Sequence, residues 1–310
     1  MDKIIETSRI PCTLCGSSES EFLFNAKDRQ HGISGSFTYV RCVNCGLVYM
    51  NPQISPQSVK AFYPDDYGPH KSHLDKAGKP EKMSKSKLEK SLPKPLLQKL
   101  NKDSCVLDVG CGSGKFLNEI KSNFGCKVHG LDISEHAAKT TKDNYGIDVF
   151  VGTVIAAPFP PNNFDVVTAW QYLEHIHNPL ESLRMFHRLL KPGGLCVIST
   201  PNFDSFNAKI FKDKWFGLEC PRHLCIYTPQ TINKLLQQAG FSLMAISHDK
   251  SSKNLINSLQ YYFYDNNYSP QHRDKVKKTF MIKAVTSPLS RISALFKKSD
   301  NMIVIAKKAT

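Results

Sequence analysis

The chain has 310 residues, of which 41% are hydrophobic and 22% are charged, and its formal net charge is +14. This composition is typical of a globular protein of one or two domains and excludes a disordered chain. No apolar run approaches the ~18 residues of a membrane-spanning helix, and the start of the chain lacks the apolar region of a secretory signal. We therefore expect a cytoplasmic protein whose ten cysteines stay reduced, bind metal or lie buried.

The positive charge is concentrated in two segments. Residues 71–102 hold ten lysines against three acids, and residues 251–310 hold eleven Lys or Arg against three Asp. Because the rest of the chain is close to neutral, we do not expect a basic DNA-binding surface on the body of the protein. Both segments are interpreted as solvated faces, with attraction to RNA or acidic lipid as the alternative.

Two C-x2-C-G turns stand out in the first 50 residues. Each turn points two thiolates at one position, and together they supply the four sulfurs of a tetrahedral zinc site. The ligands are predicted to be Cys12, Cys15, Cys42 and Cys45. Short β-like stretches between the turns, such as Phe37–Val40, indicate a small zinc ribbon over residues 1–50. Four protein ligands leave no open position, so the zinc is predicted to be structural.

Residues 51–102 are predicted to be an aromatic and proline-rich segment followed by a lysine-rich linker, with one weak helix before Asn101. From residue 103 onwards, strands and helices alternate. Strands are predicted at 105–109, 127–131, 148–151, 164–169, 195–199, 241–247 and 302–306. Helices are predicted at 115–123, 134–145, 179–190 and 228–239, with Lys191-Pro192-Gly193-Gly194 ending the third. This alternation predicts an α/β domain over residues 103–310 with a mostly parallel sheet, and a helical insertion at 250–299.

A glycine-rich turn follows the first of these strands, with glycines at positions 110, 112 and 114. Glycine lets the backbone approach a ligand closely, but the spacing lacks the third glycine of the dinucleotide-binding pattern. Asp108 precedes the turn and would repel a pyrophosphate, so it suits a cationic ligand that carries an amine. Asp132 ends the second strand, where a carboxylate can accept hydrogen bonds from both hydroxyls of a ribose.

These features resemble the class I S-adenosylmethionine-dependent methyltransferases over residues 104–248 and the last strand. The resemblance implies a Rossmann-like, seven-stranded, mostly parallel sheet with helices on both faces. It implies S-adenosylmethionine as the cofactor, packed against the three glycines, with Asp108 at its methionine end and Asp132 on its ribose. The cofactor-binding residues it assigns are Asp108, Gly110, Gly112, Gly114, Asp132, Ile133, Thr153, Val154 and Trp170.

The acceptor site is expected at the carboxyl ends of strands four and five. Strand four leads into Glu174 and His175, and the loop after strand five contains Arg222 and His223. Either histidine could take the proton that the acceptor loses. Glu174 and Arg222 are assigned to acceptor binding, the arginine through a phosphate or carboxylate. For both histidines and for Arg222, bracing of the surrounding loop is the alternative.

Quinone-pathway O-methyltransferases have a similar Glu-x-x-Glu-His stretch that can hold a divalent ion, but Gln171 replaces its first acid here. Together with the zinc ribbon and the Pro-Arg-His-Leu segment, this stretch resembles a bacterial subgroup of small-molecule methyltransferases. That resemblance implies a sugar, lipid-linked or quinone-like acceptor by analogy. An RNA methyltransferase that uses the zinc ribbon and basic linker is the main alternative. A non-enzymatic interaction module is a further alternative, which the intact cofactor signature disfavours.

Residues 276–298 combine six Lys or Arg with seven large apolar side chains and contain no acid. Pro288 is expected to divide the stretch into two short helices. Such a pattern suits a membrane interface, which would make the protein peripheral to the membrane. Packing of the stretch against its own domain, beside the acceptor pocket, is the alternative. The sequence does not indicate an oligomeric state.

Overall fold

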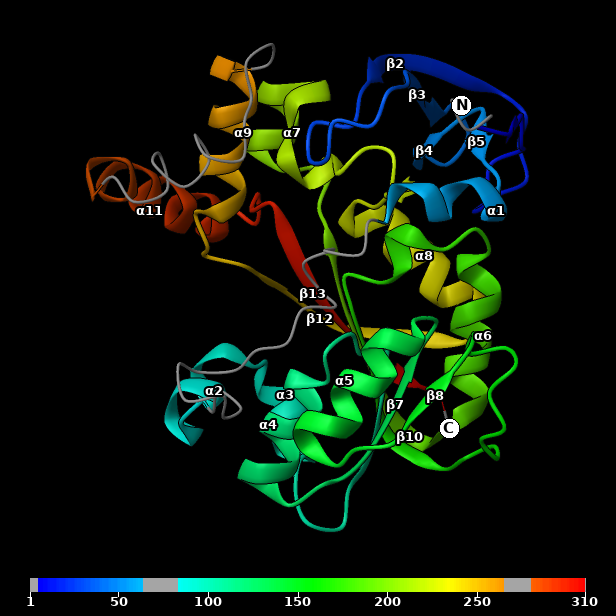
Figure 1. The fold of residues 1–310 in the computed structure, drawn as a ribbon, viewed down its shortest axis with the longest axis vertical. Coiled ribbons are helices and arrows are strands. Elements are labelled where there is room, and N and C mark those ends of the chain that lie inside the picture. The colour runs from blue at the N-terminus through cyan, green and yellow to red at the C-terminus, as the bar shows by residue number, and fades with distance from the viewer. Residues whose placement is uncertain (1–4, 64–82, 265–279, 310) are drawn as a thin grey trace.

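The computed structural model describes residues 5–63, 83–264 and 280–309, and every structural statement below refers to these residues. Seven strands form one sheet in the order β12-β13-β10-β9-β6-β7-β8 (Figure 1). Neighbouring strands are parallel except around β13, which is antiparallel to both β10 and β12. The predicted fold class is therefore confirmed. The strands are β6 (Cys105–Val109), β7 (Lys127–Asp132), β8 (Val149–Val151), β9 (Phe164–Trp170), β10 (Leu190–Pro201), β12 (Phe241–His248) and β13 (Asn301–Lys308).

Both faces of this sheet are covered by helices. Leu107 and Val109 of β6 belong to a cluster with residues of α6 (Pro179–Leu189) and α8 (Pro229–Gln238). The intervening Val106 belongs to a second cluster, with residues of α3 (Lys94–Lys99) and α4 (Lys115–Phe124). A fifth helix, α5 (Glu135–Tyr145), contacts β7 and β8. Because successive side chains of a strand point to opposite faces, a strand covered on both faces is largely apolar. Asp108 is the one charged residue of β6.

The third predicted helix ends before Lys191-Pro192-Gly193-Gly194, as expected, since α6 stops at Leu189. The segment itself belongs to β10, where the pairing with β9 shifts register between Leu190 and Leu195, as in a β-bulge. One local prediction, in the linker, is wrong. The single weak helix before Asn101 is instead two short helices, α2 (Lys85–Ser91) and α3. The linker is anchored at this point because Leu96 and Leu100 lie four residues apart on one side of the chain and are buried.

The N-terminal residues form a second sheet that the methyltransferase-like region completes. Its strand order is β11-β4-β3-β2, and all neighbours are antiparallel. The first 50 residues supply β2 (Ser20–Ala26), β3 (Phe37–Cys42) and β4 (Val48–Met50), whereas β11 (Cys225–Ile226) follows β10 in the chain. A separate pair, β1 (Thr7–Ser8) and β5 (Gln53–Ile54), precedes α1 (Pro56–Val59). The sheet therefore crosses the boundary predicted at residue 50.

The two C-x2-C turns bring four thiols together. The sulfur of Cys12 lies 3.4 Å from that of Cys45, and the sulfur of Cys15 lies 3.5 Å from that of Cys42. All four sulfurs lie within 4.8 Å of one another. Each turn ends at a glycine with positive φ, Gly16 or Gly46. A residue with a Cβ is strained in this left-handed conformation, which explains the glycine after each Cys pair.

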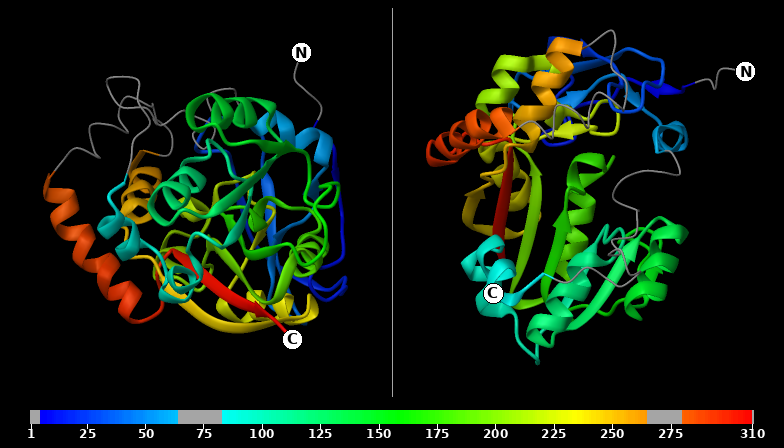
Figure 2. Two further views of the ribbon diagram at one scale, coloured as in Figure 1. Left: turned by 90° about the horizontal axis from the view of Figure 1, so that it is seen from below. Right: turned by 60° about the vertical axis from the view of Figure 1, so that its left-hand side comes forward.

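Between β12 and β13 the chain forms α9 (Lys253–Tyr264) and α11 (Phe280–Leu295), which lie near α7 (Phe206–Phe211) at one end of the molecule (Figures 1 and 2). The predicted division at Pro288 is wrong, because α11 continues through this residue. Pro288 is exposed, so water can reach the backbone around the missing hydrogen bond. In the described part of the chain, no helix is both long enough and apolar enough to cross a membrane.

A buried ion pair joins the loop after β2 to the loop before β11, the two edge strands of the N-terminal sheet. Arg222 donates to both carboxylate oxygens of Asp28, with N–O distances of 3.0 and 3.2 Å, and neither side chain is exposed. Arg222 also donates to the side chain of Glu219 at 3.1 Å and to the carbonyl of Phe62 at 3.2 Å. Asp28 in turn accepts the backbone N–H groups of Gln30 and His31. The loop after β2, the segment after α1 and the loop before β11 therefore meet at one guanidinium group.

We expect Asp28→Ala to lower the free energy of unfolding by about 3–5 kcal/mol, because the substitution leaves the Arg222 charge buried without its main partner. Glu21→Ala is the matched control. It removes the acid of the exposed Arg41–Glu21 pair and should cost at most about 1 kcal/mol. Urea denaturation of both variants measures the difference, and equal costs would contradict the assigned role of the Asp28–Arg222 pair.

Candidate active site

The glycine turn between β6 and α4 lets neighbouring groups approach its backbone closely. Gly110, Gly112 and Gly114 all have positive φ values. A Cβ on Gly110 would come within 2.9 Å of the Tyr172 ring, and one on Gly114 would come within 2.3 Å of Thr141. The turn therefore packs tightly against both the segment after β9 and helix α5. No other residue type combines this backbone conformation with these short distances.

Asp108 lies at the carboxyl end of β6, just before the glycine turn. Its side chain is buried and accepts a 2.6 Å hydrogen bond from the hydroxyl of Thr168 on β9. Burial raises the pKa of Asp108 to about 7. A cationic group beside this carboxyl would stabilise its charged form, and the amine of an amino acid is such a group.

Asp132 ends β7 and holds the glycine turn from the other side. Its two carboxylate oxygens accept the backbone N–H groups of Gly112 and Ser134, each at 2.9 Å. A carboxylate has about four lone-pair directions, so further donors such as ribose hydroxyls can still bind. The next residue, Ile133, leaves 70% of its side chain exposed. An apolar side chain in this position can cover one face of an aromatic base.

The remaining predicted cofactor residues lie at the ends of the neighbouring strands. Thr153 follows β8 and is exposed, whereas the side chain of Val154 is buried in the core. Trp170 ends β9 and packs edge-on against Phe116 of α4, with 5.1 Å between ring centroids. The glycine turn, Asp108, Asp132 and Ile133 therefore fit an amine-bearing nucleoside such as S-adenosylmethionine. Val154 can contribute only backbone groups, because its side chain points into the core.

Four ionisable groups gather beyond the end of β9. Glu174 is fully buried within the short helix η3 (Leu173–His175), and one of its oxygens accepts the hydroxyl of Thr200 at 3.0 Å. Its other oxygen is buried without a hydrogen-bond partner and lies 3.9 Å from Nε2 of His223. The rings of His175 and His223 meet edge-on, with centroids 4.6 Å apart. Glu219 places a carboxylate oxygen 3.8 Å from the same Nε2.

The two histidines and Glu174 of this cluster favour their neutral forms. Burial lowers the pKa of both His175 and His223 to about 3, and it raises the pKa of Glu174 to about 8. Nδ1 of His223 lies 2.9 Å from the carbonyl of Gly217, which can only accept. A neutral His223 therefore carries its hydrogen on Nδ1 and leaves a lone pair on Nε2, facing the two carboxyl groups.

Two members of this cluster were not assigned from the sequence. Tyr63 places its hydroxyl 2.8 Å from Nδ1 of His175, although 112 residues separate them in the chain. Glu219 has φ of +35°, a left-handed conformation that is rare outside glycine. Neither follows from local periodicity. The available signals were the aromatic segment that contains Tyr63 and the three- and four-residue spacing of Glu219 from Arg222 and His223.

Arg222 lies beside the cluster, but its guanidinium points to Asp28 and Glu219. Its backbone carbonyl lies 3.1 Å from Nδ1 of His175. This geometry favours the bracing alternative over binding of a phosphate or carboxylate. Gln171 also has a positive φ, of +50°, and its side-chain amide donates to the hydroxyl of Ser199. The three residues that could hold a metal ion here are Glu174, His175 and His223, so the third donor comes from the loop before β11 and not from position 171.

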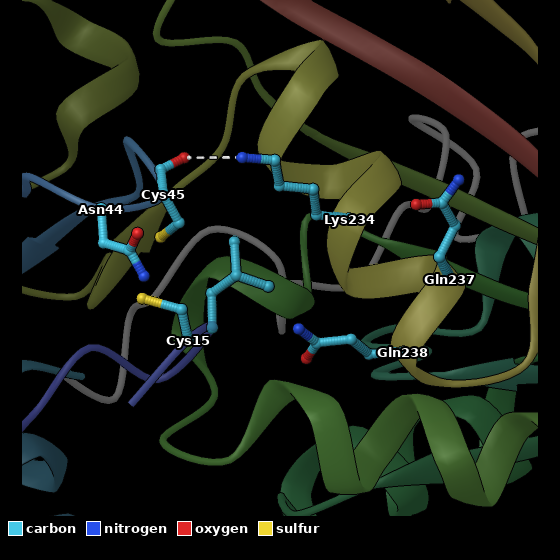
Figure 3. A pocket seen from close by; sticks show the side chains of 7 residues that line it. Cys15, Asn44, Cys45, Lys234, Gln237 and Gln238 are labelled. Carbon is cyan, nitrogen blue, oxygen red and sulfur yellow. Dashed lines mark hydrogen bonds between the residues drawn. The ribbon is translucent and has the colours of Figure 1, made fainter. Parts of the chain in front are cut away.

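A separate pocket of about 460 Å³ lies between the two C-x2-C turns and α8 (Figure 3). Its lining includes Cys15, Asn44 and Cys45 on one side and Gln237 and Gln238 on the other. The ammonium group of Lys234 donates to the carbonyl of Cys45 at 3.5 Å. The pocket shares no residue with the glycine turn or the Glu174 cluster, so we do not assign it to the acceptor.

The pH dependence of stability should reveal the buried imidazole of His223. Its pKa is lower in the folded than in the unfolded state, so its contribution is complete above the unfolded pKa of about 6.5 and is lost as pH falls towards 3. Between pH 7 and 5 this loss amounts to about 2 kcal/mol. His223→Gln should show a correspondingly smaller change in unfolding free energy over this interval. His136→Gln, on the exposed side of α5, should keep the wild-type change, and an unchanged pH dependence in His223→Gln would argue against a neutral buried ring.

Comparison with known proteins agrees with this geometry. Residues 81–246 match the family described as "Methyltransferase domain". A ubiquinone biosynthesis O-methyltransferase from Pseudomonas paraeruginosa is 40% identical over 103 residues, which cover 31% of this chain and 44% of that protein. A demethylmenaquinone methyltransferase from Listeria monocytogenes is 30% identical over 182 residues, covering 49% and 76% respectively. The chain therefore spans less than half the length of the first of these relatives and about three quarters of the second.

A solved structure from Galdieria sulphuraria, described as a candidate sarcosine dimethylglycine methyltransferase, superposes with a TM-score of 0.50. It is 17% identical and covers 73% of this chain and 85% of that chain, so it supports the fold alone. The family match spans more than half of the sequence and contains the glycine turn, Asp108 and Asp132. The chain thus belongs to the class I S-adenosylmethionine-dependent methyltransferases.

Proposed function

We propose that this chain transfers the methyl group of S-adenosylmethionine to a small-molecule acceptor held beside His175 and His223. The observation that supports this most directly is the contact between the two sites. Tyr172 packs against Gly110 of the glycine turn and stands two residues before Glu174. A cofactor on the glycine turn and an acceptor on the histidine cluster would therefore be neighbours at the carboxyl ends of β6 and β9, where α/β sheets bind ligands.

The cofactor supplies a methyl group activated by its sulfonium, so the chain itself must chiefly bind, align and exclude water. In this proposal Asp108 pairs with the amine of the cofactor, Asp132 accepts its ribose hydroxyls and Ile133 covers the adenine. The backbone at Thr153 and Val154 borders the adenine, and Trp170 borders the methionine end. All of these groups lie on one edge of the sheet, at the ends of β6, β7, β8 and β9.

His223 is proposed to take the proton that the acceptor loses. Its Nε2 lone pair faces away from the Gly217 carbonyl, and the charge of a protonated ring would be stabilised by the carboxylate of Glu219, 3.8 Å away. His175, held by Tyr63 and by the Arg222 carbonyl, is the second candidate. Glu174 is proposed to orient the acceptor through its unpaired oxygen. Its raised pKa lets it donate a hydrogen bond from a neutral carboxyl group at neutral pH.

The acceptor is proposed to be an uncharged hydroxyl compound, and a quinone-like precursor is favoured over a sugar. Two observations support this choice. The names of the similar proteins refer to ubiquinone and demethylmenaquinone, and Arg222 is already paired with Asp28 instead of being available for a phosphate. The RNA alternative rested on the zinc ribbon and the lysine-rich segment, of which residues 71–82 lie outside the described residues. It stays an untested alternative.

Asp132→Ala should weaken S-adenosylmethionine binding by about 1–3 kcal/mol, because the ribose would lose a charged acceptor. Isothermal titration calorimetry measures this, and unchanged affinity would remove Asp132 from the site.

His223→Gln is the matched variant. It should keep the affinity for the cofactor but lower methyl transfer to a hydroxylated quinone precursor by about 100-fold or more. Equal transfer at saturating acceptor would place proton removal elsewhere.

We further propose that Cys12, Cys15, Cys42 and Cys45 hold a structural zinc ion. The donor set is four thiolates within 4.8 Å of one another, which is the set that tetrahedral zinc prefers. The site lies at one end of β3, and β3 pairs with β4, which pairs with β11. A zinc ion here would therefore stabilise the strand that follows Arg222 and His223.

Metal analysis should find about one zinc per chain in the wild-type protein and substantially less in Cys45→Ser. The variant should also expose the N-terminal residues to protease before the rest of the chain, because structural zinc supplies much of the folding energy of so small a unit. Cys105→Ser, outside the cluster, is the control and should keep both zinc and resistance. Wild-type protein that lacks zinc yet resists protease equally would contradict the proposal.

A further inference from the structure

Helix α11 buries two polar side chains and exposes apolar ones, which is the reverse of an ordinary surface helix. Its polar residues Thr286 and Ser290 are only 3% and 6% exposed, whereas Val285 and Leu289 beside them are 64% and 48% exposed. Thr286 turns its hydroxyl back to the carbonyl of Ile282, and the buried hydroxyl of Ser290 has no hydrogen-bond partner. A helix on the surface of a water-soluble protein normally buries its apolar stripe and exposes its hydroxyl groups. Another apolar medium is therefore expected on the outer side of α11.

The outer side of α11 forms one continuous apolar stripe. Val285, Leu289, Ile292 and Leu295 follow helical spacing, and Leu295 is 80% exposed. The stripe extends beyond the helix through Phe296, whose ring meets that of Phe206 on α7 with centroids 6.5 Å apart. We call Val285, Leu289, Ile292, Leu295, Phe296 and Phe206 the outer apolar patch. Figure 2 shows α11 standing out from the side of the molecule.

The charged side chains on the helices that carry this patch all have one sign. Helices α7, α9 and α11 contain no Asp or Glu, and they carry Lys209, Lys253, Lys283 and Arg291, all exposed. Two more lysines, Lys297 and Lys298, follow α11 directly. Asp204, which precedes α7, is paired with both Lys209 and Lys298. Apolar side chains flanked by exposed cations match the hydrocarbon and headgroup layers of an anionic membrane surface.

We infer that the outer apolar patch docks on anionic phospholipid bilayers, with Val285, Leu289, Ile292 and Leu295 inserted at the level of the headgroups. A second copy of the chain is disfavoured as the occupant, because it would bring the same cations into contact and repel. Since the helix is too short and too polar on its inner side to cross the bilayer, it would lie in the plane of the surface. Lys277 and Lys278, which belong to the stretch predicted from the sequence, lie outside the described residues.

The patch is connected through α9, which contacts α11, to the cluster of Glu174, His175, His223 and Glu219. We call these four residues the acceptor cluster. The hydroxyl of Ser258 on α9 accepts the N–H of Phe216, the first residue of η5 (Phe216–Leu218), at 2.9 Å. The carbonyl of the next residue, Gly217, accepts from His223. Docking would therefore bring the acceptor cluster close to molecules that reside in the membrane. The docking itself does not depend on the proposed methyl transfer.

The test is co-sedimentation of the full chain with vesicles of phosphatidylcholine alone or mixed with phosphatidylglycerol, at low and high salt. We expect binding to the mixed vesicles at low salt and release at high salt. The double substitution Leu289→Glu and Ile292→Glu should weaken this binding by about tenfold or more. The double substitution Lys283→Gln and Arg291→Gln should weaken it by roughly fivefold per charge.

The matched control is Val151→Glu with Ile155→Glu, which adds the same charge at two exposed apolar positions at the β8 edge of the sheet. It should retain most of the binding. Circular dichroism and urea denaturation report whether each variant is folded, independently of docking. Equal loss in both double-glutamate variants would overturn the proposal, since it would show a response to net charge alone. Wild-type protein that does not bind mixed vesicles would overturn it as well, and so would self-association that Leu289→Glu and Ile292→Glu abolish.

Discussion

The buried guanidinium of Arg222 is the constraint on which the arrangement of this molecule depends. It neutralises Asp28 from the loop after β2, is fully buried and donates to the carbonyl of Phe62, just before the tyrosine that contacts His175. Burying such a pair costs several kcal/mol of desolvation, which only complete hydrogen bonding offsets. Because the planar fork must satisfy all of its partners at once, it fixes the relative positions of three segments. The loop that carries His223 is thereby held against the end of β9.

Unlike the charged Asp28–Arg222 pair, the proposed acceptor cluster holds groups that favour their neutral forms. Glu174 and His223 are buried and His175 is half-buried. The shifted pKa of each of the three favours its neutral form. A charged ring next to Arg222 would be penalised both by desolvation and by repulsion. The cluster can therefore lie beside a fixed positive charge and still present an uncharged lone pair. This combination favours an uncharged ligand over an anion, because the histidine rings stay neutral and Arg222 is already paired with Asp28.

The N-terminal sheet contacts the loop of the proposed acceptor site through strand pairing and a hydrogen bond. Strand β11 connects the loop of Arg222 and His223 to β4, and the hydroxyl of Tyr39 on β3 donates to the His223 carbonyl at 2.8 Å. A change at the cysteine cluster can thus reach the acceptor residues through two strands.

The sequence by itself determined the features that short spacing encodes. The alternating strands and helices, the glycine turn with its flanking aspartates and the paired C-x2-C turns all follow from residues a few positions apart, because local backbone geometry places them. Tertiary structure alone decided the partners of Arg222 and His175, since Asp28 lies 194 residues and Tyr63 lies 112 residues away in the chain. It also decided that β11 joins the N-terminal sheet and that α11 turns its apolar stripe outwards. Periodicity shows that a helix has two faces, but which face is buried depends on the neighbours that the rest of the fold brings to it.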